Sequence, residues 1–133
     1  MHVVDSCGWI EWLTDGTLAE NFAPFLADSG NLIVPTLVQF ELYKWCLREK
    51  DEAAALDVIG LTETCLVRPL DTRIALSAAD ISVRYKLTMA DAVVYASALA
   101  DGGQLLTSDA HFEGLPNVRY WQKGAPFNPK NRS

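Results

Sequence analysis

Four acidic side chains lie in apolar stretches of the sequence, where an isolated charge is unfavourable. Asp5 and Asp109 follow strand-like runs, and Glu41 and Asp91 lie within helix-like runs. A carboxylate in apolar surroundings lowers stability unless it is paired or bound to a cation. These residues are spread from the first strand to the last quarter of the chain, and they predict one cation site that the fold assembles.

Carboxylate and water oxygens are the ligands that Mg²⁺ and Mn²⁺ prefer. A cluster of acids can hold one or two such ions, about 4 Å apart, which activate a water and offset the charge on a scissile phosphate. This chemistry needs no Ser or Cys nucleophile beside a His base, and the chain has only two histidines, His2 and His111. We expect His2 to be structural and His111 to lie at the rim of the site without a catalytic role.

The elements that must position these acids alternate between strands and helices. Short apolar runs predict strands at residues 2–5, 32–34, 65–67, 104–107 and 117–121. Apolar residues at helical spacing predict helices between residues 6 and 15, and at 18–27, 36–48, 52–59, 72–85 and 89–100. This alternation predicts an α/β fold with three layers (α/β/α) and a central, mostly parallel sheet of about five strands.

Local signals refine where these helices begin and end. Ser6 is expected to cap the first helix, Thr36 and Gln39 to form a capping box, and Gly60 to end the fourth helix. Glu11 has the pattern of a surface acid. Further caps are predicted at Asp51, Asp71 and Thr88.

Sites in parallel sheets form outside the carboxyl ends of the strands. Asp5 and Asp109 follow two such ends, Glu41 lies on the helix after the second strand, and Asp91 lies in the first turn of the helix before the fourth. All four can therefore converge on one edge. Each also has a structural alternative: Asp5 and Asp109 as caps, Asp91 as a partner of its helix dipole, and Glu41 as a solvated helix residue.

The bulk composition describes one ordinary domain. The chain has 133 residues and 50% hydrophobic residues, which predicts a domain at residues 1–122 and a C-terminal tail at 123–133. No apolar stretch is long enough to span a membrane. The net charge of −6 argues against a general nucleic-acid coat protein but not against a nuclease, because bound cations reverse the local sign. Cys7, Cys46 and Cys65 lack metal-site spacing, which is typical of reduced thiols in a cytoplasmic protein.

Four motifs occur in one order along almost the whole chain. They are Val3-Val4-Asp5-Ser6, Pro35-Thr36-Leu37-Val38-Gln39-Phe40-Glu41, Leu87-Thr88-Met89-Ala90-Asp91-Ala92 and Leu105-Leu106-Thr107-Ser108-Asp109-Ala110-His111-Phe112. With these motifs the chain resembles a PIN-domain ribonuclease, and more narrowly a VapC-type toxin of a toxin–antitoxin pair.

The resemblance implies a Mg²⁺- or Mn²⁺-dependent endoribonuclease that cleaves transfer or ribosomal RNA. It implies that Asp5, Glu41, Asp91 and Asp109 bind the metal. Ser6 and Thr107 match hydroxyl positions that support the acids or a water, and plain capping is an equal alternative for both. A homodimer and a VapB-type antitoxin are the implied partners. The sequence departs from the family at Ser108 and His111, where a basic residue often stands beside the last acid.

Two other functions remain open from the sequence. One is a non-catalytic PIN-fold module that binds RNA or protein, and the intact acids argue against it. The other is phosphoryl transfer through a phosphorylated Asp. Such a site needs a nearby Lys, and the chain has none between the fourth strand and Lys123. A related phosphatase also needs a second acid two residues after Asp5, where Cys7 stands. Several aromatic residues are either interface or core residues, namely Trp9, Trp12, Phe40, Tyr43 and Trp45.

Overall fold

The computed structural model describes residues 1–124 and contains the sheet that the sequence predicts. Its strands are β1 (His2–Val4), β2 (Leu32–Pro35), β3 (Leu66–Arg68), β4 (Gln104–Thr107) and β5 (Val118–Tyr120). Their order is β3-β2-β1-β4-β5, and every neighbouring pair is parallel. The sheet of the described residues is therefore fully parallel rather than mostly parallel.

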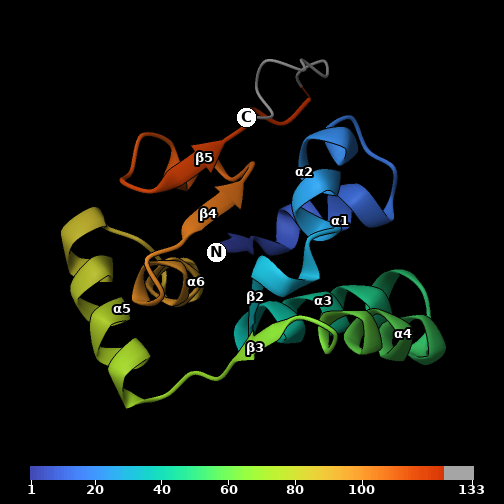
Figure 1. Cartoon of the computed structure of the whole chain (residues 1–133), viewed down its shortest axis with the longest axis horizontal. Helices are drawn as coiled ribbons and strands as arrows, with labels where there is room; N and C mark the ends of the chain where they lie inside the picture. Colours follow the sequence, from blue (N-terminus) through green and yellow to red (C-terminus); the bar gives the residue numbers. More distant parts are fainter. Residues whose placement is uncertain (125–133) are drawn as a thin grey trace.

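The helices form three pairs around this sheet. They are α1 (Ser6–Leu13), α2 (Ala19–Leu26), α3 (Thr36–Glu49), α4 (Glu52–Thr62), α5 (Thr72–Tyr85) and α6 (Met89–Ala100), with two short 3₁₀ turns, η1 (Ser29–Asn31) and η2 (Ala110–Phe112). In Figure 1, α5 lies at the left edge, α6 lies below β4, and the α1–α2 and α3–α4 pairs lie to the right of α6. The α/β fold class is thereby confirmed.

The core is built from the strands, from α6 and from the inward faces of α1, α2, α3 and α5. Val3, Val4, Leu105 and Leu106 in the two central strands are fully buried, as expected for strands covered on both faces. Helix α6 is buried without a break from Ala92 to Ala98, so it runs through the interior. Its first turn therefore reaches the sheet edge as part of a rigid element.

Three of the predicted helix boundaries are wrong. Asp5, not Ser6, is the N-cap of α1, and its side chain accepts a hydrogen bond from the Ser6 N–H. The Thr36–Gln39 capping box does not form, because Pro35 is the N-cap and the Gln39 amide donates to Thr62 on α4 instead. Helix α4 continues through Gly60 to Thr62, a buried residue whose hydroxyl accepts the Gln39 amide. Glycine inside a helix costs only about 1 kcal/mol relative to alanine.

Other local predictions agree with the structure. Asp51, Asp71 and Thr88 each accept a backbone N–H as N-caps of α4, α5 and α6. Glu11, however, is a buried residue and not a surface acid, because its carboxylate accepts the Leu18 N–H at the start of α2. A side chain from α1 thus joins α1 to α2 beside the first strand.

The predicted tail at residues 123–133 lies almost wholly outside the described residues, which end at Gly124. Within residues 1–124, no helix is long and apolar enough to cross a bilayer.

Candidate metal centre

The predicted acids lie beyond the carboxyl ends of β1 and β4. These two strands are neighbours in the sheet, and the chain builds outward from them in opposite directions, through β2 and β3 on one side and β5 on the other. Ligand sites in parallel α/β sheets form at such a switch point. The first residues after the two strands therefore stand at the favoured place for a site.

Asp5 is the most enclosed of the four acids. Its side chain is 6% exposed, and Oδ1 accepts the Ser6 N–H at 2.9 Å while Oδ2 accepts the Thr107 hydroxyl at 2.9 Å. Burial raises the pKa of Asp5 to about 6, and the nearby charges of Asp91 and Asp109 add to the shift against the lowering effect of these hydrogen bonds. Asp5 therefore both caps α1 and faces the other acids.

Glu41, on α3, interacts electrostatically with Asp5, Asp91 and Asp109. Its Oε1 atom is buried and has no hydrogen-bond partner among the described residues. Burial raises the pKa of Glu41 to about 7, and the charge of Asp5 contributes next, whereas a hydrogen bond with the Ser6 side chain acts in the opposite direction. Glu41 is therefore half-buried, which favours the ligand interpretation over that of a freely solvated helix residue.

Asp91 lies in the first turn of α6, where its N–H donates to the Thr88 hydroxyl. Burial raises the pKa of Asp91, and the neighbouring Asp109 charge raises it further, against the influence of His111. The helix N-terminus is a favourable place for a carboxylate. The position is thus compatible with both the dipole and the metal-ligand interpretation.

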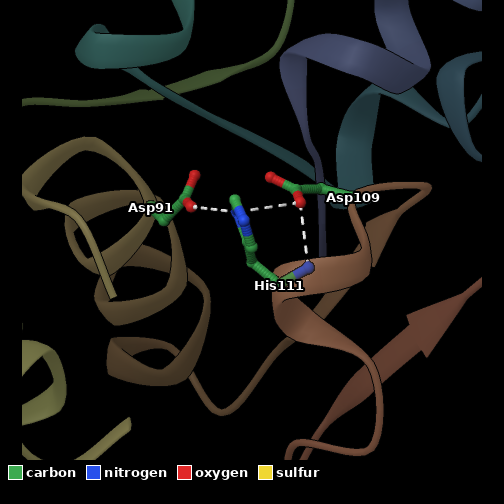
Figure 2. A group of neighbouring side chains, drawn as sticks. All are labelled: Asp91, Asp109 and His111. Atoms are coloured by element: carbon green, nitrogen blue, oxygen red, sulfur yellow. Dashed lines mark hydrogen bonds and ion pairs between the residues drawn. The ribbon is translucent and has the colours of Figure 1, made fainter. Parts of the chain in front are cut away.

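Asp109 is the N-cap of η2, and its Oδ1 accepts the His111 N–H at 2.9 Å. The His111 ring turns back over the cap, so that Nδ1 lies 3.2 Å from Asp109 Oδ1 and 3.3 Å from Asp91 Oδ2. Figure 2 shows the imidazole between the two carboxylates. The predicted rim position of His111 agrees with its 70% exposed side chain, and its two carboxylate contacts were not foreseen.

Thr107 connects the two strand-end acids through one hydroxyl. Its Oγ1 donates to Asp5 Oδ2 and accepts the Asp109 N–H, each at 2.9 Å. The residue is fully buried, so this hydroxyl has a fixed place. Thr107 therefore binds the Asp5 carboxylate and the backbone of Asp109, and Ser6 reaches Glu41 from the first turn of α1.

Sequence reasoning missed Cys7. Its Sγ accepts the Ser108 N–H at 3.4 Å and lies 3.6 Å from Asp5 Oδ2 as a donor. Burial raises the pKa of the Cys7 thiol to about 11, which keeps it protonated and able to donate. Only its place two residues after Asp5 hinted at this contact in the sequence.

The donor set suits a divalent cation. Asp91, Asp109 and His111 offer ligand atoms that all lie within 4.8 Å of one another. The orphaned Glu41 Oε1 and the raised pKa values of Asp5 and Glu41 indicate negative charge that the described residues do not neutralise. Oxygen donors predominate, which is the preference of Mg²⁺ and Mn²⁺, so these residues fit such an ion.

Comparisons with known proteins agree with this architecture. The family described as the PIN domain matches residues 2–117. A sequence search of curated proteins gave no significant match.

Several solved structures share the fold. A toxin–antitoxin complex from Klebsiella pneumoniae aligns with a TM-score of 0.73 and 20% identity, covering 89% of this chain and 95% of that chain. The DNA-bound VapBC of Salmonella typhimurium gives 0.70 and 17%, covering 90% and 96%. VapC20 of Mycobacterium tuberculosis, described as a toxin that cleaves the sarcin–ricin loop, gives 0.63 and 17%, covering 78% and 85%. With a family match over residues 2–117 and this shared fold, the chain belongs to the PIN-domain family, and it resembles the VapC-type toxins within it.

Proposed function

We propose that the protein is a divalent-metal-dependent endoribonuclease, the toxin of a toxin–antitoxin pair. The proposal is supported by the electrostatic interaction of Glu41 with Asp5, Asp91 and Asp109, and by a buried Glu41 oxygen that has no hydrogen-bond partner among the described residues. Membership of the PIN-domain family supports the same proposed activity.

The four carboxylates are the proposed ligands of Mg²⁺ or Mn²⁺. Such an ion supplies charge that promotes attack by water and stabilises the leaving oxygen of a phosphodiester. Thr107 positions the Asp5 carboxylate and the Asp109 backbone through its two hydrogen bonds, and Ser6 lies beside Glu41. No side-chain nucleophile is required, which fits the exposed position of His111 and the protonated state of Cys7.

The proposed substrate is transfer or ribosomal RNA, and the protein would act in the cytoplasm. Support for RNA comes from the family and from the similar fold of VapC20, whose described target is the sarcin–ricin loop. Proteins that read RNA by sequence mostly target exposed loops. We therefore expect cleavage at a loop of a structured RNA rather than along a duplex.

The proposed partners are a VapB-type antitoxin and a second copy of the chain. Similar folds have been solved as toxin–antitoxin complexes. Helix α3 presents Phe40 (60% exposed) and Leu47 (46% exposed) along a groove of about 770 Å³ that Tyr43 and Ile59 also line. Trp9, by contrast, is buried in the core. Of the aromatic residues predicted to be either interface or core residues, Phe40 is therefore at the surface and Trp9 is in the core.

A non-catalytic RNA- or protein-binding module is not favoured. All four acids are present, and the charges of the other acids raise the pKa values of Asp5 and Glu41. Such repulsion is unfavourable, and a purely structural domain gains nothing from it.

The test is cleavage of total cellular RNA by purified, antitoxin-free protein with Mg²⁺, with Mn²⁺ and with a chelator. Asp5→Asn is the active-site variant, because Asn preserves the helix cap, and Asp57→Asn on the exposed side of α4 is the matched control. We expect discrete fragments that require metal, persist in the control and disappear in Asp5→Asn. The absence of fragments from folded protein with either metal would contradict the proposal.

A further inference from the structure

His111 holds a fixed position between two of the acids. Its backbone N–H is bound by Asp109 Oδ1 within the cap of η2. Its Nδ1 lies 3.3 Å from Asp91 Oδ2 and 3.2 Å from Asp109 Oδ1, as Figure 2 shows. The ring thus joins α6 to the segment after β4 and directs one nitrogen at the carboxylates.

These spacings match those of ligands around one ion. With metal–ligand bonds of about 2.1 Å in octahedral geometry, neighbouring donor atoms are about 3.0 Å apart and opposite ones about 4.2 Å. The two Nδ1–oxygen distances are close to the first value, and all three donor atoms lie within 4.8 Å of one another. An ion among them therefore requires shifts of only a few tenths of an ångström.

A second observation points to a cation at the same place. The Glu41 Oε1 atom is buried without a hydrogen-bond partner in the described residues, and Glu41 is electrostatically coupled to Asp91 and Asp109. An ion beside Asp91 and Asp109 would offset this charge as well. The exposed side of the His111 ring (70% of the side chain) leaves Nε2 free to carry the proton in water while Nδ1 serves as a ligand.

We propose that His111 is a direct nitrogen ligand of the metal, binding through Nδ1 beside Asp91 and Asp109. This inference rests on the proposed metal-dependent function. Imidazole suits transition-metal ions, whereas Mg²⁺ prefers oxygen ligands. His111 therefore shifts the selectivity of the site from Mg²⁺ towards Mn²⁺ and the later divalent ions.

The direct test is pulsed electron paramagnetic resonance of the untagged protein loaded with Mn²⁺. A coordinated imidazole produces ¹⁴N modulation of the electron spin echo. We expect this modulation in the unmodified protein, its loss in His111→Gln, and its retention in His2→Gln, which alters the only other histidine. Absence of the ¹⁴N signal in the unmodified protein, or its persistence in His111→Gln, would overturn the assignment.

Calorimetric titration provides a second readout. We expect His111→Gln to weaken Mn²⁺ binding by at least about tenfold, the loss seen when even an outer-shell partner of a metal is removed, and to weaken Mg²⁺ binding much less. Equal losses for both ions would contradict the selectivity role. If Mn²⁺ binds and RNA is cleaved without any ¹⁴N modulation, only this inference fails. If neither ion binds folded protein, the proposed function fails with it.

Discussion

Helix α6 has an acidic residue at each end, and the protein treats the two charges differently. Asp101, at the C-terminal cap, forms an ion pair with Arg68 of β3. Asp91, in the first turn, has no Lys or Arg ion-pair partner within residues 1–124. Its carboxylate instead contacts the His111 imidazole. Two acids on one helix thus differ in whether the described residues supply an Arg or Lys partner.

The helix dipole alone would suggest the reverse arrangement. A carboxylate is favourable at a helix N-terminus and unfavourable at a C-terminus, by about 0.3–1 kcal/mol. The C-terminal Asp101 therefore gains from its arginine. At the N-terminus the dipole is opposed by burial and by Asp109, which raise the pKa of Asp91. Asp101, which has a structural role, is thus paired with a cation from the chain itself, whereas the clustered acids have no Lys or Arg ion-pair partner among residues 1–124.

The largest expected effect comes from Asp91→Asn. RNA cleavage should fall to background because a metal ligand is lost, while the fold is kept. The thermal midpoint of the metal-free variant should equal or exceed that of the unmodified protein, since repulsion between Asp91 and Asp109 disappears. Cleavage assays and thermal unfolding in a chelator measure the two effects. Full activity in the variant would remove Asp91 from the site.

The stability of the metal-free protein should depend on pH because Asp5 and Glu41 have raised pKa values. The pKa values of about 6 for Asp5 and about 7 for Glu41 exceed those of the unfolded chain, about 4. Between pH 4 and 7 the folded metal-free protein therefore holds protons that the unfolded chain has released, so the free energy of unfolding falls as pH rises. For Asp5 the fall is about 2 kcal/mol.

Urea unfolding at a series of pH values in a chelator measures this trend. The difference between the unmodified protein and Asp5→Asn isolates the Asp5 contribution from that of other carboxylates. Mg²⁺ or Mn²⁺ at about 100 times its Kd should then restore about 2.7 kcal/mol at pH 7. A difference that does not vary with pH would show that Asp5 carries no uncompensated charge.

Thr107→Val should sharpen the comparison by removing the hydroxyl that holds two acids together. The change keeps the shape of the side chain but leaves the Asp109 N–H and Asp5 Oδ2 without their 2.9 Å partner. Loss of such buried hydrogen bonds lowers stability by about 1–3 kcal/mol, and metal affinity should fall with it. Thr107→Ser retains the hydroxyl and is the control. Equal behaviour of the Val and Ser variants would contradict an orienting role.

The smallest expected effect is that of Asp101→Asn. The ion pair with Arg68 is partly exposed, and pairs of this kind contribute about 0.2–1 kcal/mol. The variant should therefore be slightly less stable in the absence of metal, opposite in sign to Asp91→Asn, and should keep its RNA cleavage. Denaturant unfolding at matched pH decides the sign. Stabilisation by Asp101→Asn would remove the contrast between the two ends of α6.

Much of the architecture could be predicted from the sequence because its signals are local. Alternating strand-like and helix-like runs predicted the parallel sheet, and the placement of Asp5 and Asp109 after two strands predicted which edge they share. The errors include a case in which a tertiary contact outweighs a local signal. Gln39, for example, donates to Thr62, 23 residues along the chain, rather than to its own helix end.

The finer structure of the site was less predictable because its contacts join distant segments. Cys7 contacts Thr107 and Ser108 across about a hundred residues, which no local pattern encodes. The His111 contact depends on how η2 turns towards α6, which was equally hidden. Glu11 looked like a surface acid because only the path of α1 into α2 places its carboxylate at the Leu18 N–H.

Asp5, Glu41, Asp91 and Asp109 are proposed to form one divalent-metal site. The most direct measurement is anomalous X-ray diffraction from crystals of the protein containing Mn²⁺. We expect an anomalous peak bounded by Asp5, Asp91 and Asp109. The Glu41 carboxylate should point at the ion or at a water bound to the ion. A peak elsewhere on the molecule, or none at Mn²⁺ concentrations that support RNA cleavage, would contradict it.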